Sequence, residues 1–129
     1  MATKHKGTAA ERSLQRMFWE AGWACVRVAG SGSGSFPNPD LLAGNILRKL
    51  AVECKSTSGD SVYIPKEDIE ALKSFAGIFG AEAWIAVKFD NKGWHFMNLE
   101  DLKETESSFA IRWKDMELKG LSFRELIGK

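Results

Sequence analysis

Cysteine, histidine and long hydrophobic runs are scarce in this sequence. Two cysteines and two histidines occur among 129 residues, and their spacing matches no Cys/His metal-binding motif. Because Cys25 and Cys54 both lie in apolar, strand-like segments, we expect each to be a buried free thiol. No apolar run approaches the length of a membrane span, and the polar start Met-Ala-Thr-Lys-His-Lys lacks a secretory leader. These absences predict a cytoplasmic protein with no membrane contact and no catalytic histidine.

A large excess of charge is also missing, because the formal net charge is only +1. Dedicated nucleic-acid binders often have a far more basic total, so composition alone gives weak support for that function. The distribution is uneven, because basic residues gather in the N-terminal part of the chain: Lys4, Lys6, Arg12, Arg16 and Arg27. A near-neutral body with one basic face therefore remains compatible with DNA binding.

A run of glycine and serine over residues 30–35 is the one low-complexity segment. No Gly-Lys-Ser/Thr follows it and no helix opens from it, which excludes a phosphate-binding P-loop. Two interpretations stay open. The run is either a plain flexible connection or a loop whose hydroxyls and bare backbone close onto a DNA strand.

Length, hydrophobic periodicity and turn residues predict a single α/β domain spanning residues 1–129. We expect a mixed central sheet of about five strands with helices packed on its faces. The expected helices cover Thr8–Ala21, Pro65–Phe79 and Ser122–Ile127. The expected sheet strands cover Trp23–Ala29, Asp40–Ala43, Leu50–Ser56, Ala83–Phe89 and Trp94–Met97, with shorter strands at Val62–Ile64 and Phe109–Trp113 and a helical turn at Leu99–Lys103.

The pair Pro39-Asp40, followed by Glu53-Cys54-Lys55 in an apolar stretch, is the most informative pattern. On a strand, side chains two apart share a face, so Glu53 and Lys55 point together. If the two segments form a hairpin turning near Gly44, Asp40 lies opposite Glu53, with Cβ atoms about 5 Å apart. Two carboxylates that close require a proton or a bridging cation. A hard divalent ion suits them, and the Cys54 carbonyl can add a further oxygen.

Lys55 is then placed to orient or deprotonate an attacking water, or to neutralise charge on a reacting phosphate. A simpler interpretation is that Asp40 ends a loop and that Glu53 and Lys55 form a solvated charge pair. Glu11 likewise has two interpretations, because it lies three residues after Thr8 and so fits a capping box. It also borders the apolar seam of its helix and can reach toward Asp40 and Glu53.

The predicted second helix is apolar over about half its circumference, wider than the ~100° stripe that one core contact requires. Its apolar residues are Ile69, Leu72, Phe75, Ala76, Ile78 and Phe79. The excess width favours a homodimer contact over a helix that is simply sunk deeper in the core.

An ordered set of motifs resembles the archaeal Holliday junction resolvase family, within the PD-(D/E)xK nucleases of restriction-endonuclease-like fold. The motifs are Lys6-Gly7, Glu11-Arg12, Val26-Arg27, the Gly/Ser run, Pro39-Asp40, Glu53-Cys54-Lys55 and Ala86-Val87-Lys88-Phe89. The likeness spans nearly the whole chain, although the segment after about Leu99 contains nothing distinctive.

The resemblance implies a role for each matched position. Glu11, Asp40 and Glu53 would hold Mg²⁺, with Mn²⁺ as a substitute, and Lys55 would act with the attacking water. Ser31 would lie near the cut phosphate, although Ser33 or Ser35 can fill that place. The implied DNA contacts are Lys6, Arg12, Arg27 and Lys88, and the implied dimer contacts are Phe75 and Phe79.

The implied activity is hydrolysis of phosphodiesters in four-way branched DNA by a homodimer with one or two metal ions per site. It leaves 3′-hydroxyl and 5′-phosphate ends and selects junction shape more than sequence. Two alternatives remain. One is a nuclease of the same fold that acts on linear or damaged duplex, and the other is a non-catalytic DNA-binding scaffold.

Overall fold

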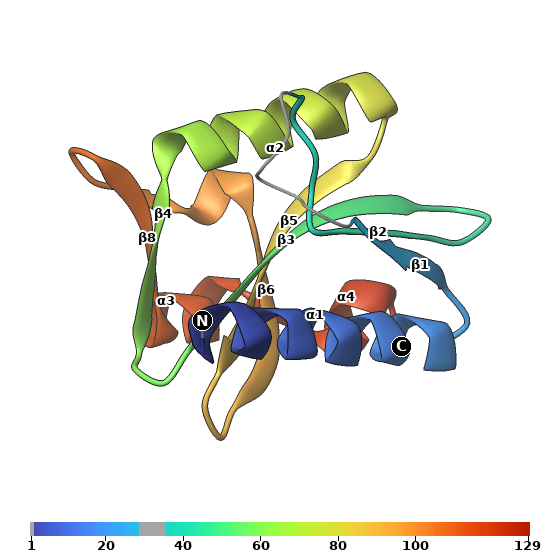
Figure 1. Ribbon diagram of the computed structural model, residues 1–129, viewed down its shortest axis with the longest axis horizontal. Helices are drawn as coiled ribbons and strands as arrows, with labels where there is room; N and C mark the ends of the chain where they lie inside the picture. Colours follow the sequence, from blue (N-terminus) through green and yellow to red (C-terminus); the bar gives the residue numbers. More distant parts are fainter. Residues whose placement is uncertain (1, 29–35) are drawn as a thin grey trace.

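The computed structural model describes residues 2–28 and 36–129, with side chains from Gly7 onward within these ranges. Figure 1 shows a central twisted sheet with helices on both sides. In chain order the elements are α1 (Ala2–Glu20), β1 (Ala24–Arg27), β2 (Leu41–Gly44), β3 (Lys49–Thr57), β4 (Ser61–Pro65), α2 (Lys66–Phe79), β5 (Glu82–Phe89), β6 (Gly93–Asn98), the 3₁₀ turn η1 (Leu99–Asp101), β7 (Lys103–Glu104), β8 (Ser108–Arg112), α3 (Trp113–Lys119), β9 (Leu121–Ser122) and α4 (Phe123–Ile127).

The main sheet has six strands in the order β1-β2-β3-β5-β6-β9. Strands β3 and β5 are parallel, while the other neighbours are antiparallel. The parallel pair requires a crossover connection, which β4 and α2 provide. The remaining strands form a second sheet in the order β4-β8-β7. The predicted mixed α/β architecture is confirmed.

Two hydrophobic cores lie on opposite faces of the main sheet, and strand β3 contributes to both. Leu50 and Val52 pack in the core under α1 and α4, whereas Ala51 packs in the core under α2 and α3. Figure 1 shows α1 and α2 on opposite sides of the sheet. This alternation confirms that neighbouring residues of the strand face different layers. Neither core depends on a disulfide, because both cysteines are free thiols.

Turn and cap residues bound several of these elements. Helix α2 ends at Gly80, whose φ of 83° is a left-handed conformation that glycine adopts without steric cost. Helix α4 begins after Ser122, which forms a capping box with Glu125. The β5–β6 hairpin turns through Asn91 and Gly93, both with positive φ. Within the described residues, no helix is long and apolar enough to cross a membrane.

Several expectations need correction. Helix α1 begins at Ala2 instead of Thr8, so Thr8 lies inside the helix and the capping-box interpretation of Glu11 is wrong. The main sheet has six strands because the two-residue strand β9 pairs with β6. The two shorter predicted strands correspond to β4 and β8, which form a second sheet that was not predicted. Helix α3 was not predicted either. The first strand is shorter than expected at Ala24–Arg27, and Ala29 lies outside the described residues.

Candidate active site

The open end of the β2–β3 hairpin brings two carboxyl groups together. Leu41 pairs with Val52, so one step outward places Asp40 beside Glu53, as the sequence pattern predicted. The Asp40 N–H donates to the Val52 carbonyl at 3.1 Å, which continues the ladder to this point. Asp40 is only 8% exposed and is the one buried charged residue of the described part of the chain.

Backbone groups hold Asp40 in place. The Cys54 N–H donates to Asp40 Oδ2 at 2.8 Å, and the Val28 N–H donates to the Asp40 carbonyl oxygen at 2.9 Å. The N–H and C=O of one strand residue point to the same edge, so the Cys54 carbonyl also faces the Asp40 side. The Cys54 thiol packs against the core under α1, and its burial raises its pKa well above the ordinary value. Cys54 therefore offers backbone atoms to the site and keeps its sulfur away.

Glu53 is half-buried. Burial first, and then the nearby carboxylates of Asp40, Asp68 and Glu11, raise the pKa of Glu53 to about 8 against the opposing charge of Lys55. Such a carboxyl holds a proton near neutral pH unless a cation compensates its charge. Lys55 lies two residues further along β3, so it shares the face of Glu53, as predicted.

Helix α1, which packs on one face of the main sheet, contributes Glu11. Glu11 Oε1 accepts a hydrogen bond from Arg27 Nε at 3.0 Å, within an ion pair that is largely shielded from solvent. Arg27 Nη2 also approaches Thr8 Oγ1 at 3.5 Å. Burial and then the charge of Asp40 raise the pKa of Glu11, while the hydrogen bond from Arg27 lowers it. Glu11 therefore belongs to the same electrostatic cluster as Asp40.

The cluster does not form a closed ligand sphere. Among the described side chains, no group of three histidine, cysteine, aspartate or glutamate residues lies close enough to hold a metal ion. Glu11 instead points to Arg27. The donor set still fits a hard divalent cation, because every donor atom is an oxygen. Burial and the charge of Asp40 also raise the pKa values of two of the carboxyls, Glu11 and Glu53.

The other predicted site residues lie on α1 and β5 or outside the described residues. Arg12 is exposed on α1, and Lys88 is exposed on β5 opposite Ser56, one residue past Lys55. Ser31, together with its alternatives Ser33 and Ser35, lies outside the described residues, as does the side chain of Lys6.

Two site contacts were not predicted from the sequence. The pairing of Glu11 with Arg27 joins residues sixteen apart in the chain, and the charge of Asp68 reaches Glu53 from the first turn of α2. An aspartate in a first helical turn is ordinarily read as a complement to the helix dipole. No spacing in the sequence therefore distinguishes Asp68 as a neighbour of the site.

The C-terminal half of α2 presents an apolar surface to solvent. The rings of Phe75 and Phe79 stack with centroids 5.3 Å apart, and Ile78 is 87% exposed. These side chains line an open apolar cavity of about 190 Å³ together with Pro37 and Ser74. The predicted excess of apolar width on this helix is confirmed.

Comparison with known proteins gives concordant matches over the whole chain. The family described as archaeal Holliday junction resolvase (Hjc) matches residues 2–129. The crossover junction endodeoxyribonuclease Hjc of Archaeoglobus fulgidus is 43% identical over 98% of this chain and 92% of its own length. The protein of the same name from Methanocaldococcus jannaschii is 37% identical over 96% of this chain and 88% of its own length.

A solved structure is similar as well. The structure of Archaeoglobus fulgidus Hjc, described as a Holliday junction resolvase from an archaeal hyperthermophile, superposes with a TM-score of 0.88 at 40% sequence identity. The match covers 96% of this chain and 97% of that one. It therefore includes the segment after Leu99, for which the sequence motifs gave no guidance.

Proposed function

The chain belongs to the archaeal Holliday junction resolvase family, and from this premise we propose that it cuts four-way DNA junctions as a Mg²⁺-dependent homodimer. The predicted family, restriction-endonuclease-like fold and endonuclease class, with its role in recombination and repair, are confirmed by this membership. Nucleases of this kind are generally metal-dependent and act on branched DNA. The identity of the ion, the dimer, the residue roles and a cytoplasmic location beside the DNA are our proposal.

Asp40, Glu53 and Glu11, with the Cys54 carbonyl, would hold the Mg²⁺ ion, for which Mn²⁺ can substitute. The observation that carries this assignment is the strand register that sets the half-buried Glu53 beside the buried Asp40, where burial and the charge of Asp40 raise the pKa of Glu53 to about 8. A bound divalent ion supplies the missing positive charge, lowers the pKa of water and stabilises charge on a reacting phosphate. Glu11 would turn from Arg27 to take part, which frees the Arg27 guanidinium for a DNA phosphate.

Lys55 orients the attacking water and donates to the phosphoryl oxygens as their charge grows. Water attacks phosphorus in line, a new P–O bond forms, and the bond to O3′ breaks. The leaving O3′ takes up a proton and becomes a hydroxyl, while the phosphate stays on the 5′ end. Ser31 would contact the cut phosphate. Arg12, Lys88 and Lys6 would hold neighbouring phosphates and so place the junction without reading its sequence.

A second copy of the chain would cover the apolar surface of α2 around Phe75 and Phe79. A two-fold dimer places two identical sites at a fixed separation, which suits symmetric cuts in opposed strands of a junction. Phe79→Asp should convert a dimer to a monomer in sedimentation equilibrium. Leu118→Asp is the matched control, since Leu118 is 83% exposed on α3. A monomeric wild type would overturn the dimer.

The deciding experiment compares a four-way junction with a linear duplex of the same sequence, each incubated with protein and Mg²⁺. We expect paired nicks in the junction, little cutting of the duplex, and no cutting by Asp40→Asn. Equal rates on both substrates would favour a general duplex nuclease. Junction binding without cleavage in Mg²⁺ or Mn²⁺ would favour the scaffold alternative.

A further inference from the structure

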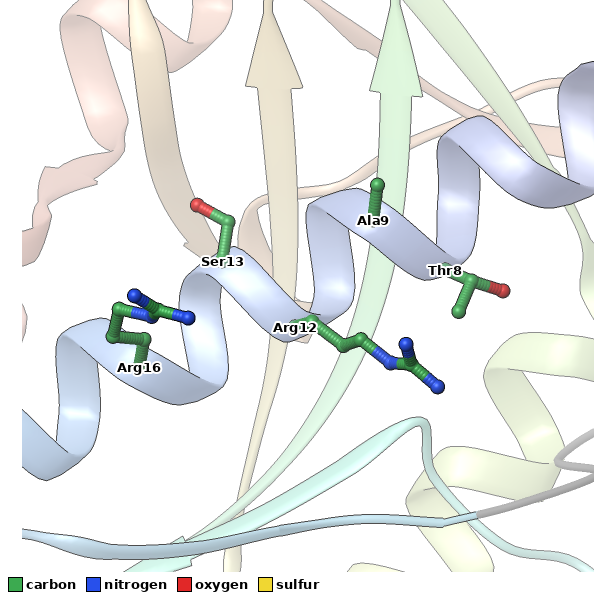
Figure 2. A pocket seen from close by; sticks show the side chains of 5 residues that line it. All are labelled: Thr8, Ala9, Arg12, Ser13 and Arg16. Atoms are coloured by element: carbon green, nitrogen blue, oxygen red, sulfur yellow. The ribbon is translucent and has the colours of Figure 1, made fainter.

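The solvent face of α1 has a basic row that extends away from the candidate active site. Arg12 and Arg16 are four residues apart, so they lie on the same side of the helix, and both are exposed. Figure 2 shows them on α1 with Ser13 between them and Thr8 at one end. Together with Ala9 these residues line an open depression of about 550 Å³. Its lining thus combines two guanidinium groups, two hydroxyls and one small apolar side chain.

Within the part of the chain that the structure describes, no carboxylate forms an ion pair with Arg12 or Arg16. The neighbouring acid Glu11 is already engaged by Arg27. Positive charge on this face is therefore available to an external anion.

The row is continuous with the candidate active site. Thr8 lines the depression and also approaches Arg27 Nη2 at 3.5 Å, while Arg27 binds Glu11. From Arg12 to Arg16 the helix advances about 6 Å, and one DNA strand advances about 3.4 Å along its axis per phosphate. A backbone held at Arg12 thus has another phosphate within reach of Arg16.

We infer that Arg16, with the Ser13 hydroxyl, binds a backbone phosphate in one arm of the branched DNA, one helical turn beyond Arg12. Guanidinium forks and hydroxyls are the groups that commonly hold DNA phosphates, and the small Ala9 leaves space for the sugar. The contact positions the arm and carries no sequence information. This inference rests on the proposed function, because it takes branched DNA as the ligand.

The test measures junction affinity in EDTA, where the DNA stays uncut, over a range of salt concentrations. Arg16→Ala should weaken binding about three- to tenfold and reduce the slope of log affinity against log salt by about 0.9, which corresponds to one lost phosphate contact. Arg16→Lys should restore most of the slope, since it keeps the charge. Ser13→Ala should weaken binding by a smaller factor. Alanine is the strongest helix former, so these exposed changes should leave α1 folded.

Lys103→Ala is the matched control, because Lys103 is an exposed cation on β7 of the second sheet. It should bind the junction within about twofold of wild type and keep the full salt slope. If Arg16→Ala behaves like Lys103→Ala, the inference is wrong.

Neutral methylphosphonate links, placed singly along one arm, locate the contact. At one position, the neutral link should weaken junction binding by wild type but should not weaken binding by the Arg16→Ala variant any further. The absence of such a position would also overturn the inference. A wild type that neither binds nor cuts the junction would instead refute the proposed function itself.

Discussion

The two ends of the β2–β3 hairpin hold charged side chains in opposite environments. At the open end, burial and the charges of Asp40 and Glu11 raise the pKa of Glu53 to about 8. At the turn end, Arg48 donates two hydrogen bonds of 2.8 Å to Glu82 on β5 and lowers its pKa. Burying like charges is unfavourable for the fold, whereas a forked Arg–carboxylate pair supports it.

This contrast separates function from stability within one structural unit. The turn end satisfies its charges internally, because Arg48 Nη1 also donates to the Leu126 carbonyl at 2.6 Å and its guanidinium lies 5.5 Å from the Trp23 ring. At the open end, three carboxyl groups from separate segments come together, and the pKa values of Glu11 and Glu53 are raised. Changes at the open end should therefore remove activity, and changes at the turn end should remove stability.

The largest effect should come from Asp40→Asn. Losing this carboxylate removes several kcal/mol of charge stabilisation at the metal, so the rate of junction cleavage in Mg²⁺ should fall about 10³-fold or more. The rate is measured from single-turnover nicking of a labelled junction. Glu82→Gln, a carboxylate change at the turn end, is the control and should cut at the wild-type rate. Equal losses in both variants would mean that the comparison fails.

Lys55→Ala should follow, with a cleavage rate about 10²-fold lower at saturating junction. Junction affinity in EDTA should change little, because the lysine acts on the reacting groups more than on the DNA backbone. Single-turnover rates and binding are measured on the same preparation. A variant that loses affinity while cutting bound DNA at the normal rate would instead make Lys55 a binding residue.

The pH dependence of stability should differ between the two ends. The pKa of Glu53 rises from an ordinary value near 4.5 to about 8 on folding, so the folded protein binds more protons than the unfolded chain between these limits. Stability therefore falls as pH rises through this window. Measured in EDTA, the Tm of wild type should drop on the order of several degrees as pH rises through this window. The Glu53→Gln variant should show a flatter dependence of Tm on pH.

Glu82 gives the opposite sign, because its folded-state pKa is lowered. Its contribution is present above its unfolded pKa and disappears only as pH falls below it. The Glu82→Gln protein should therefore still lose stability as pH rises from 5 to 8, as wild type does. At neutral pH it should be less stable than wild type. A Glu53→Gln protein with the wild-type pH profile would contradict the electrostatic account of the open end.

The smallest effect should come from Arg48→Ala. It removes a partly exposed forked pair and one hydrogen bond to a carbonyl, which together contribute about 1–2 kcal/mol to the free energy of unfolding. Urea unfolding measures this loss, and Arg48→Lys should recover only part of it because lysine lacks the fork. Cleavage by the folded protein should remain at the wild-type rate. A strong loss of cleavage without loss of stability would reverse the comparison.

Long, periodic segments were predictable because their own residues specify them. The alternation in β3 and the capped pattern of α2 appear within single windows of sequence, and both elements occur at nearly the expected bounds. Strands β7 and β9 have only two residues each, so they exist through pairing with β8 and β6. Such strands have no sequence period of their own.

The start of α1 shows how a local rule can give the wrong answer. Thr8 and Glu11 have capping-box spacing, yet the helix begins at Ala2 and includes Gly7, a poor helix former. Glu11 instead binds Arg27 on β1. Glu11 thus takes part in a long-range ion pair and not in the local capping pattern. Both side chains of the pair are largely shielded from water, and charge interactions are stronger in such a low-dielectric environment.

Residue spacing was enough to pair Asp40 with Glu53 and to orient Lys55 with them, because the period of a strand and the register of a short hairpin are local properties. The strength of that charge cluster is not local. The raised pKa of Glu53, the reach of Asp68 and the Arg27 partner of Glu11 arise when segments far apart in the chain exclude water from one place. Electrostatic energy depends on these three-dimensional distances and on burial, and only folding establishes both.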